Sequence, residues 1–419
     1  MALEDVEARV RVRKDERMAE ISTNDIDVDA LVATISAAAA LASKAPKQPD
    51  YPGFAGPGEP TPKLDRYSAA TAEASDAHRT DLVMKAIDRI RDEGLIGAGM
   101  LETSVHASVV ATTEGCARAH DGTQAQFRVF ALEDAAGRGA SGYGSSLDRD
   151  IGALTIEKDT DEAIFIAKNG RNPGRVDAGT WDVVMEPPAV AELLEWLGMV
   201  SFTAPEVEQG TSALAGRIGE RITGNQVQIA EDPFSDERGV LADPFDREGT
   251  IRRRVSIIED GVARGVLFDR LHASRNTKKG VEGSSTGSAI VPELGTRFGV
   301  GTVALSLAGG RAKTTRELIA GVTRGLYIRR LHYVNGLVEP RRAVMTGLSR
   351  DGCFAIESGA VARAVGNVRM TDSFLEMLGR AEAMTAERKA ILSTWTEHGS
   401  LHVPAILFRN VRFSSGSRA

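Results

Sequence analysis

Glu192 and Glu195 lie three residues apart in the apolar segment AVAELLEWLG, where two carboxylates could act together. On a helix this spacing places both side chains on one face, about one turn apart. Such a pair could bind a metal ion or share a proton. The apolar residues around them predict an amphipathic helix over 189–198, with the glutamates on its solvated side. We therefore expect neither a metal ligand nor a catalytic residue here.

His398 and His402 have an H-x₃-H spacing that suits zinc when both residues lie on a helix. Gly399 and the apolar run from Val403 indicate a loop leading into a strand, in which such residues lie far apart. No metal site is therefore predicted. Residues 309–311, Gly-Gly-Arg, precede a helical segment and could bind an anion. They lack a phosphate-loop lysine and a G-x-G-x-x-G pattern, so an ordinary turn is predicted.

Hydroxyl side chains cluster over residues 284–288, which raises the possibility of a serine nucleophile. No G-x-S-x-G elbow accompanies them, and we expect a flexible loop near a substrate cleft, with Ser285 and Thr286 as candidate cleft residues. Arg270 and Tyr333 follow strand patterns and are further candidates for contact with a peptide.

The remaining reactive side chains favour structural roles. Residues 252–254 are three arginines, expected to form surface salt bridges in an acidic chain, or else to contact a partner. His272 and His332 are predicted to be structural. Cys116 and Cys353 are the two cysteines of the sequence, far apart and without a CxxC pattern, so neither a disulfide framework nor a cysteine-rich zinc site is indicated.

The bulk composition predicts a globular protein of two domains, because 419 residues exceed what one ordinary core holds. The net charge of −7 argues against nucleic acid or an anionic membrane as the main partner. No apolar run reaches the roughly 18 residues of a membrane span. The charged segment MALEDVEARVRVRKDER does not resemble a signal peptide, so a cytoplasmic location is expected.

The first half of the chain alternates helical and extended patterns, which predicts an α+β domain over 1–178. Residues 4–21 read as one strand, and 44–67 as a loop rich in proline and glycine. Helices are predicted over 29–43, 76–94 and 146–170, and strands over 99–133 with a turn at 120–122.

The second half, residues 179–419, has many short extended runs between turn residues, which is typical of a mainly antiparallel β domain. A few helices interrupt it, over 189–198, 312–325 and 372–379. The most ordered pattern is DPFDREGTIRRRVSIIEDGVARGVLFDR, over 243–270. Its Asp260-Gly261 step supplies the positive φ of a hairpin turn between strands over 252–258 and 262–268.

This pattern resembles the C-terminal domain of the TldD/PmbA family, which is linked to metal-dependent peptide hydrolysis. Further stretches match in the same order, including GTWDVVMEP from Gly179, GSSTG from Gly283, TGLSRDGCFAIESG from Thr346 and GSLHVP from Gly399. The residues of the hairpin that carry the resemblance form a fingerprint: Asp243, Pro244, Phe245, Asp246, Glu248, Gly249, Asp260, Gly261, Asp269 and Arg270.

The family divides into TldD-type subunits, which carry zinc, and PmbA (TldE)-type partners, which do not. TldD-type chains have H-E-x-x-x-H on the helix that opens the C-terminal domain and a cysteine ligand near the C-terminus. Here that helix reads AVAELLEWLG, no histidine occurs between His120 and His272, and LFRNVRFSSGSRA contains no cysteine. The sequence is therefore similar to the PmbA (TldE) type, with no catalytic residue, metal or cofactor expected in this chain.

The resemblance implies a non-catalytic subunit that pairs with an HExxxH zinc metallopeptidase of the TldD type, in a heterodimer or a larger assembly. The complex would degrade or process small unfolded peptides. Two alternatives remain open at this point. The chain could be an independent metal-dependent peptidase that uses Glu192 and Glu195, or a homodimeric peptide-binding scaffold.

Overall fold

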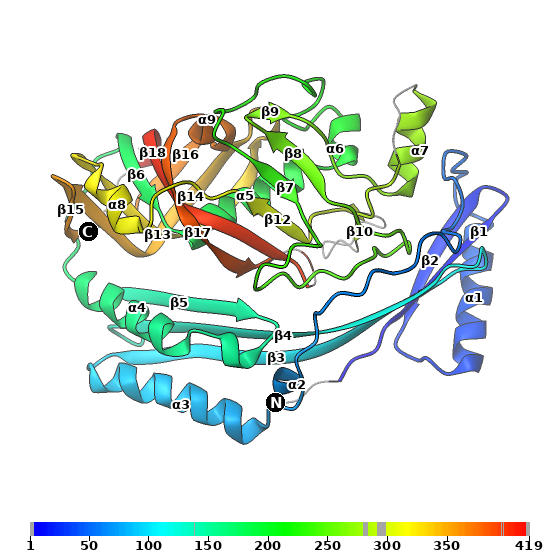
Figure 1. Ribbon diagram of the computed structural model, residues 1–419, viewed down its shortest axis with the longest axis horizontal. Coiled ribbons are helices and arrows are strands. Elements are labelled where there is room, and N and C mark those ends of the chain that lie inside the picture. Colours follow the sequence, from blue (N-terminus) through cyan, green and yellow to red (C-terminus); the bar gives the residue numbers. More distant parts are fainter. Residues whose placement is uncertain are drawn as a thin grey trace.

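The computed structural model describes residues 4–137, 139–279, 284–290, 299–394, 396 and 398–415. Figure 1 shows two layers, with the first part of the chain forming the lower layer and the right-hand end, and the β-rich second part lying above it. Most strand pairs are antiparallel, which confirms the predicted α+β class. Within the described residues no helix is long and apolar enough to cross a membrane.

The chain begins with a small unit at the right of Figure 1, made of β1 (Ala8–Lys14), β2 (Arg17–Thr23) and α1 (Val28–Ala42). The single strand predicted over 4–21 is wrong, because Asp15 and Glu16 both have positive φ and reverse the chain. The helix predicted over 29–43 is confirmed. The loop predicted over 44–67 is also confirmed, and it leads from this unit back to the lower layer.

The lower layer is a three-stranded antiparallel sheet of order β3-β4-β5, and one of its faces is covered by helices α3 and α4. The alternating residues Phe127 and Val129 of β4 pack against these helices, while the neighbouring polar residues point to the opposite face. The bounds are α2 (Ala69–Ala72), α3 (Asp76–Asp92), β3 (Ile96–Ala111), β4 (Ala117–Leu132), β5 (Ser141–Asp148) and α4 (Ile156–Asn169).

Two predictions in this layer are wrong for steric reasons. The chain reverses at 112–116, and Gly122 lies inside β4, where a Cβ would stand 2.5 Å from the ring of His106. Position 122 is therefore a glycine because the side chain of His106 lies close to it, and not because the chain turns there. The helix predicted over 146–170 begins only at Ile156. The residues before it form β5, whose Gly144 packs against the backbone of Asp159.

The upper layer is built on an eleven-stranded sheet whose longest path runs β15-β14-β13-β6-β18-β12-β7-β8-β9. Its principal strands are β6 (Gly179–Met185), β7 (Ile229–Glu231), β8 (Val255–Glu259), β9 (Val262–Ala263), β12 (Ala304–Leu307), β13 (Arg324–Glu339), β14 (Val344–Glu357), β15 (Ala360–Ala364), β16 (Arg369–Ser373), β17 (Ala381–Leu392) and β18 (Ser400–Ser415). A separate pair is formed by β10 (Ala289–Ile290) and β11 (Gly299–Val300).

In the described part of the chain, five α-helices accompany this sheet: α5 (Pro187–Ser201), α6 (Ala204–Glu208), α7 (Arg270–Lys278), α8 (Thr315–Ala320) and α9 (Phe374–Gly379). The hairpin turn predicted at Asp260-Gly261 is confirmed, since both residues have positive φ between β8 and β9. The second strand of that hairpin is shorter than predicted. Asp269 ends the extended segment and caps α7 by accepting a hydrogen bond from the amide of His272.

Candidate functional site

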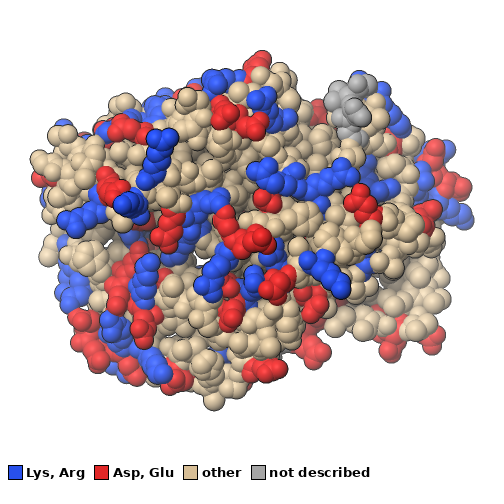
Figure 2. All heavy atoms as spheres, in the orientation of Figure 1, with Lys and Arg blue, Asp and Glu red and all other residues tan. Residues whose placement is uncertain are grey.

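A hollow lies between the two layers of Figure 1, lined by β4, β5 and α4 on one side and by α5, β13 and β17 on the other. It has two adjoining parts, with cavity volumes of about 490 and 290 Å³. Tyr143, Ser145 and Arg330 line both parts, so the two form one cleft. Basic and acidic side chains are interspersed over the face of the molecule shown in Figure 2.

Helix α5 forms one wall of the smaller part with the side of the helix that carries Pro188, Ala191, Glu192 and Glu195. These positions recur every three to four residues and therefore share one face. The opposite face packs into the main hydrophobic core. The solvated face predicted for Glu192 and Glu195 is thus wrong: α5 is buried nearly all round, and only 7% of the surface of Glu195 is exposed.

The two glutamates have different surroundings. Glu195 Oε1 accepts hydrogen bonds from Ser393 Oγ and from the amide of Thr394, each at 2.6 Å, so it ties α5 to the end of β17. Among the described residues, no group donates a hydrogen bond to Glu192. Burial and the neighbouring charge of Glu195 raise the pKa of Glu192 to about 7, although Arg330 opposes the shift. Glu192 can therefore gain or lose a proton near neutral pH.

The wall facing α5 comes from β4 and β5 of the lower layer. Gln126 and Arg128 alternate with the core residues Phe127 and Val129, and so point away from α3 and α4 into the cleft. Gln126 is only 5% exposed, and its Oε1 has no hydrogen-bond partner in the part of the chain that the structure describes. The sequence analysis did not identify Gln126 as a candidate. The alternation of apolar and polar residues along this strand could have indicated that its polar side faces a second part of the molecule.

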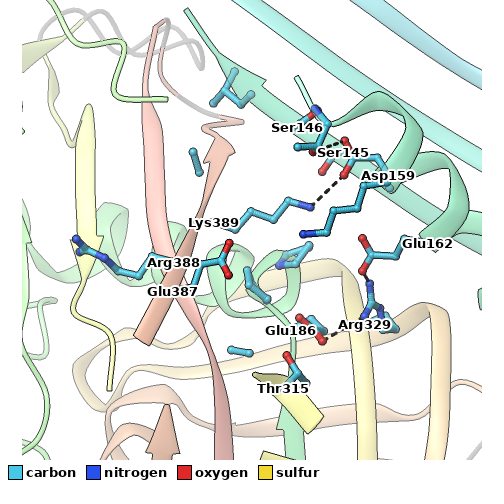
Figure 3. Close-up of a pocket in the computed structure, with 18 of the residues that line it drawn as sticks. Ser145, Ser146, Asp159, Glu162, Glu186, Thr315, Arg329, Glu387, Arg388 and Lys389 are labelled. Atoms are coloured by element: carbon cyan, nitrogen blue, oxygen red, sulfur yellow. Dashed lines mark hydrogen bonds and ion pairs between the residues drawn. The ribbon is translucent and has the colours of Figure 1, made fainter. Parts of the chain in front are cut away.

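The larger part of the cleft contains a network of buried and half-buried charges (Figure 3). The Nζ atom of Lys389 lies 3.6 Å from Oδ1 of Asp159, and burial lowers the pKa of the lysine. Arg329 forms ion pairs with Glu162 and Glu186. Burial raises the pKa of Glu186, which also accepts a hydrogen bond of 2.6 Å from the hydroxyl of Tyr327. None of these residues was predicted, because they come from distant parts of the chain.

The fingerprint residues lie outside this cleft and are engaged in internal contacts. Asp246 accepts hydrogen bonds from the amides of Glu248, Thr250 and Ala289. Asp243 binds His106 Nε2 at 3.0 Å and Ser108 Oγ at 2.7 Å, and thereby joins β3 to the second half of the chain.

Glu248 makes three contacts that join distant segments. It receives hydrogen bonds from Tyr51, from Arg11 and from the amide of Arg270 at 3.2, 3.1 and 2.9 Å. Burial, followed by the charges of Asp246 and Asp269, raises the pKa of Glu248. The hairpin pattern is therefore the anchor for the unit that contains β1 and for the loop over 44–67.

The four candidate cleft residues are not gathered in one cleft. Arg270 donates hydrogen bonds of 3.0 Å to the carbonyls of Gly53 and Phe54, and so holds the loop over 44–67. Ser285 and Thr286 both bond to the carbonyl of Phe268. Tyr333 is 75% exposed on β13. None of the four lines either part of the cleft described above.

The residues predicted to be structural are mostly buried. Cys116 and Cys353 are free buried thiols, and burial raises the pKa of Cys353 to about 12. His272 contacts the cap residue Asp269 at 2.7 Å. His332 lies on β13 beside Tyr333.

Two further predictions concern residues 252–254 and the histidine pair. The surface position predicted for Arg252 is wrong. This residue is only 7% exposed and donates a hydrogen bond to the carbonyl of Gly287. Arg254 does form an exposed ion pair, with Asp232.

His398 lies in a loop and stacks on His106, whereas His402 lies on β18. In the described part of the chain no three His, Cys, Asp or Glu residues are grouped so that they could hold a metal ion.

Sequence comparison finds relatives of parts of this chain. An uncharacterized protein of Methanocaldococcus jannaschii is 30% identical over 137 residues, which are 33% of this chain and 32% of that protein. A protein named metalloprotease from Methanothermobacter thermautotrophicus is 26% identical over 245 residues, 57% of this chain and 48% of that protein. The chain thus spans about half, or less, of the length of these relatives.

Two solved structures share the fold over nearly the whole chain. TldE from Thermococcus kodakarensis superimposes with a TM-score of 0.85 and 20% identity, covering 98% of this chain and 94% of that one. A putative modulator of DNA gyrase from Thermotoga maritima gives a TM-score of 0.82 and 20% identity, covering 98% and 89%. The family model for the PmbA/TldA metallopeptidase C-terminal domain matches residues 178–415. The chain therefore belongs to the PmbA/TldD family.

Proposed function

We propose that the protein is a non-catalytic subunit of the PmbA (TldE) type, which pairs with a zinc-bearing TldD-type metallopeptidase and helps to enclose a chamber for small unfolded peptides. The observation that carries this proposal is the side of α5 that faces the cleft. It presents Glu192 and Glu195, where the zinc-bearing members of the family are expected to present histidines.

Zinc-dependent hydrolysis needs three protein ligands around one metal and an open position for water. Glu195 already binds Ser393 and Thr394 and holds α5 against β17, so its carboxylate has a structural task. Glu192 is left as one carboxylate with a pKa near 7, which is a poor zinc ligand because a proton competes for it. This arrangement supports a role in shaping the cleft, with the zinc supplied by the partner.

The cleft itself suits a peptide. Its two adjoining parts, of about 490 and 290 Å³, form one hollow between the layers, with charged groups along the walls and partly apolar residues between them. An extended chain needs about 3.4 Å per residue, so a few residues of a peptide fit along such a hollow. A folded protein does not fit, which agrees with a chamber for unfolded substrates.

Co-purification with an HExxxH-bearing family member, followed by a peptidase assay, tests the proposal. We expect a stable complex in which zinc accompanies the partner and peptidase activity rises when this chain is added. Substitution of the first histidine in the partner motif should abolish activity. Absence of both a complex and any gain in activity would contradict the proposal.

Metal analysis of the purified chain separates this function from an independent metallopeptidase. The proposal expects no stoichiometric zinc on this chain alone. Zinc bound one to one, and lost on Glu192→Ala, would show that α5 holds a metal and would overturn the non-catalytic role. Glu206→Ala is the matched control, since Glu206 is a partly buried glutamate outside the cleft.

A further inference from the structure

We infer that the outer edge of β3 is a contact between two copies of this chain, in which the two β3 strands pair antiparallel over residues 103–111. The contact goes beyond the proposed function, because it joins like chains and lies away from the cleft. It rests on an unprotected strand edge, on an exposed apolar face beside that edge, and on a sequence that is complementary to itself about a two-fold axis.

The edge of β3 is the first observation. β3 stands at one end of the sheet order β3-β4-β5, so β4 is its strand partner among the described residues. An edge strand leaves backbone N–H and C=O groups without a strand partner, and natural proteins protect such edges with charged residues, proline or a β-bulge. Residues 103–113 contain no Asp, Glu, Lys, Arg or Pro. The pairing of β3 with β4 is also continuous, without a bulge, from Ile96 to Ala111. This edge is therefore open to another strand.

The face beside this edge is the second observation. β3 and β4 continue as a two-stranded ribbon past the part of the sheet that α3 and α4 cover, toward the unit with α1 (Figure 1). Apart from Asp121, the exposed residues on the helix side of this ribbon are apolar: Val105, Ala107, Val109, Ala111, Ala117 and Ala119. Val105 is 55% exposed and Val109 is 73% exposed. A contiguous apolar surface of this kind is typical of a contact with another protein.

The opposite face of the ribbon is already occupied within the chain. His106 and Ser108, which alternate with the exposed residues of β3, both bond to Asp243 in the second half of the chain. The free edge and its apolar face are therefore directed away from the fingerprint segment. They are also on the side of the sheet opposite to the cleft, into which the alternate residues of β4 point. A second copy bound at this edge does not fill the cleft.

The sequence of β3 identifies the second strand as another copy of β3. When two such strands pair antiparallel about Ala107, Val105 of each copy lies opposite Val109 of the other, and the two Ala107 residues meet on the two-fold axis. Cross-strand pairs of β-branched residues stabilise a sheet. Such a contact needs only one self-complementary surface, and it closes at two copies.

The net negative charge of the chain does not oppose this register. Glu102 lies opposite Thr112 of the other copy, and the two Glu102 residues are about 34 Å apart along the strands. Asp121 lies on β4 beside Ala107. In a sheet of order β4-β3-β3-β4 the two Asp121 residues are three strand spacings apart, which is about 14 Å. Both separations exceed the Debye length of about 8 Å at physiological salt, so the repulsion is largely screened.

Sedimentation equilibrium of the full chain, from about 1 to 200 µM, measures the contact. We expect a mass that rises with concentration toward twice 44.6 kDa. The Kd should be micromolar, because pairing through one strand edge lies at the low end of interface sizes. Ala107→Lys places two ammonium groups side by side on the axis and should raise the Kd by about fivefold or more.

Ala119→Lys is the matched control for that variant. It adds the same charge to the same exposed face, but on β4, one strand away from the edge. It should leave the Kd unchanged. A chain that remains monomeric over the whole concentration range, or a dimer that both lysine variants weaken equally, would overturn the inference.

A single cysteine tests the register. Opposite residues of an antiparallel pair have Cα atoms about 4.5–5.5 Å apart, which a disulfide spans. Ala107→Cys should therefore give a covalent dimer on mild oxidation or with a short bifunctional maleimide. Ala111→Cys should not, because its two copies would stand about 27 Å apart. The native thiols Cys116 and Cys353 are buried, and the unsubstituted chain gives their background. Equal cross-linking of the two variants, or none with Ala107→Cys, would contradict the register.

The outcome is separable from the test of the proposed function. A chain that dimerises through Ala107 but forms no complex with the zinc-bearing family member retains this contact and loses the proposed function. A chain that forms an active complex but is monomeric alone, and whose Ala107→Lys variant no longer binds the zinc-bearing member, would assign the edge of β3 to that member and overturn the pairing of like chains.

Discussion

The fingerprint segment and the cleft face of α5 each contain a glutamate with a raised pKa, buried in the first case and half-buried in the second, and the two carboxylates differ in their hydrogen bonds. Glu248 receives hydrogen bonds from Tyr51, Arg11 and the amide of Arg270, from three separate parts of the chain. Glu192 receives none from the described residues. The first carboxylate is saturated with donors, and the second faces a hollow.

This difference distinguishes a carboxylate with a structural role from one that is open to a ligand. A carboxylate whose donors all come from its own chain is fixed, and removing it leaves those donors buried without partners. A carboxylate whose acceptor sites are open has capacity for a ligand, at a cost to the stability of the fold. The strongest sequence pattern of this protein therefore marks a structural anchor, and the functional surface that we propose lies on α5, a helix with no recognisable motif.

The largest expected effect is in the fingerprint. Glu248→Ala removes the acceptor of three donors: the hydroxyl of Tyr51, the amide of Arg270 and the guanidinium of Arg11, which keeps its ion pair with Glu20. A buried donor left without an acceptor costs about 1–3 kcal/mol, so we expect a loss of about 3–5 kcal/mol of unfolding free energy. The contacts of the loop over 44–67 should loosen at the same time, since Tyr51 loses its acceptor. Chemical denaturation and limited proteolysis of this loop measure the two effects.

Glu248→Gln serves as the control for that substitution, because an amide keeps one acceptor oxygen and most of the shape. We expect it to lose less than half as much stability as Glu248→Ala. If both substitutions left the unfolding free energy unchanged, Glu248 would not anchor the first unit, and the contrast with Glu192 would disappear.

The second expected effect, at Glu192, is a gain in unfolding free energy and not a loss. The pKa of Glu192 is raised to about 7 in the folded protein, above its usual value of about 4.5, so ionisation destabilises the fold as pH rises through this interval. Glu192→Gln should therefore stabilise the protein by about 2–3 kcal/mol at pH 8 and leave it unchanged at pH 4. Thermal unfolding at the two pH values checks this.

The neighbouring position supplies the matched comparison. Glu195→Ala removes the acceptor for Ser393 Oγ and the amide of Thr394, and should destabilise the protein by about 1–3 kcal/mol at the same pH. Equal signs for the two substitutions would show that the two glutamates of α5 do not differ in the way that their contacts indicate.

The sequence alone predicts the elements with strong local periodicity, such as α1, α3, α5 and the turn at Asp260-Gly261. It misplaces features that are decided by distant contacts. Gly122 looks like a turn residue because its steric partner, His106, lies on another strand. Glu192 looks solvated because the lower layer that covers α5 is built from residues more than forty positions away. The cleft could not be predicted for the same reason, since its walls meet only in the folded protein.

The third expected effect is at Asp243, the first residue of the fingerprint segment. Burial would raise the pKa of Asp243, but the hydrogen bond and charge of His106, with the hydrogen bond of Ser108, lower it to about 2. A lowered pKa contributes stability above the usual value of about 3.8, and this is lost as pH falls toward 2. Asp243→Asn should therefore cost about 1–2 kcal/mol at pH 7 and almost nothing at pH 2, as measured by urea unfolding. An equal cost at both pH values would mean that the charge of Asp243 is not what joins β3 to the second half.

The smallest effect is expected at Tyr333, which the sequence pattern favours as a cleft residue and which the structure places on the exposed surface of β13. Tyr333 is 75% exposed, and its ring lies at a tilt against the ring of His332, so truncation removes little buried surface. Tyr333→Ala should change the unfolding free energy by less than about 0.5 kcal/mol. A peptide-binding defect in this variant, with normal stability, would place part of the substrate path on this outer strand and would extend the functional surface well beyond α5.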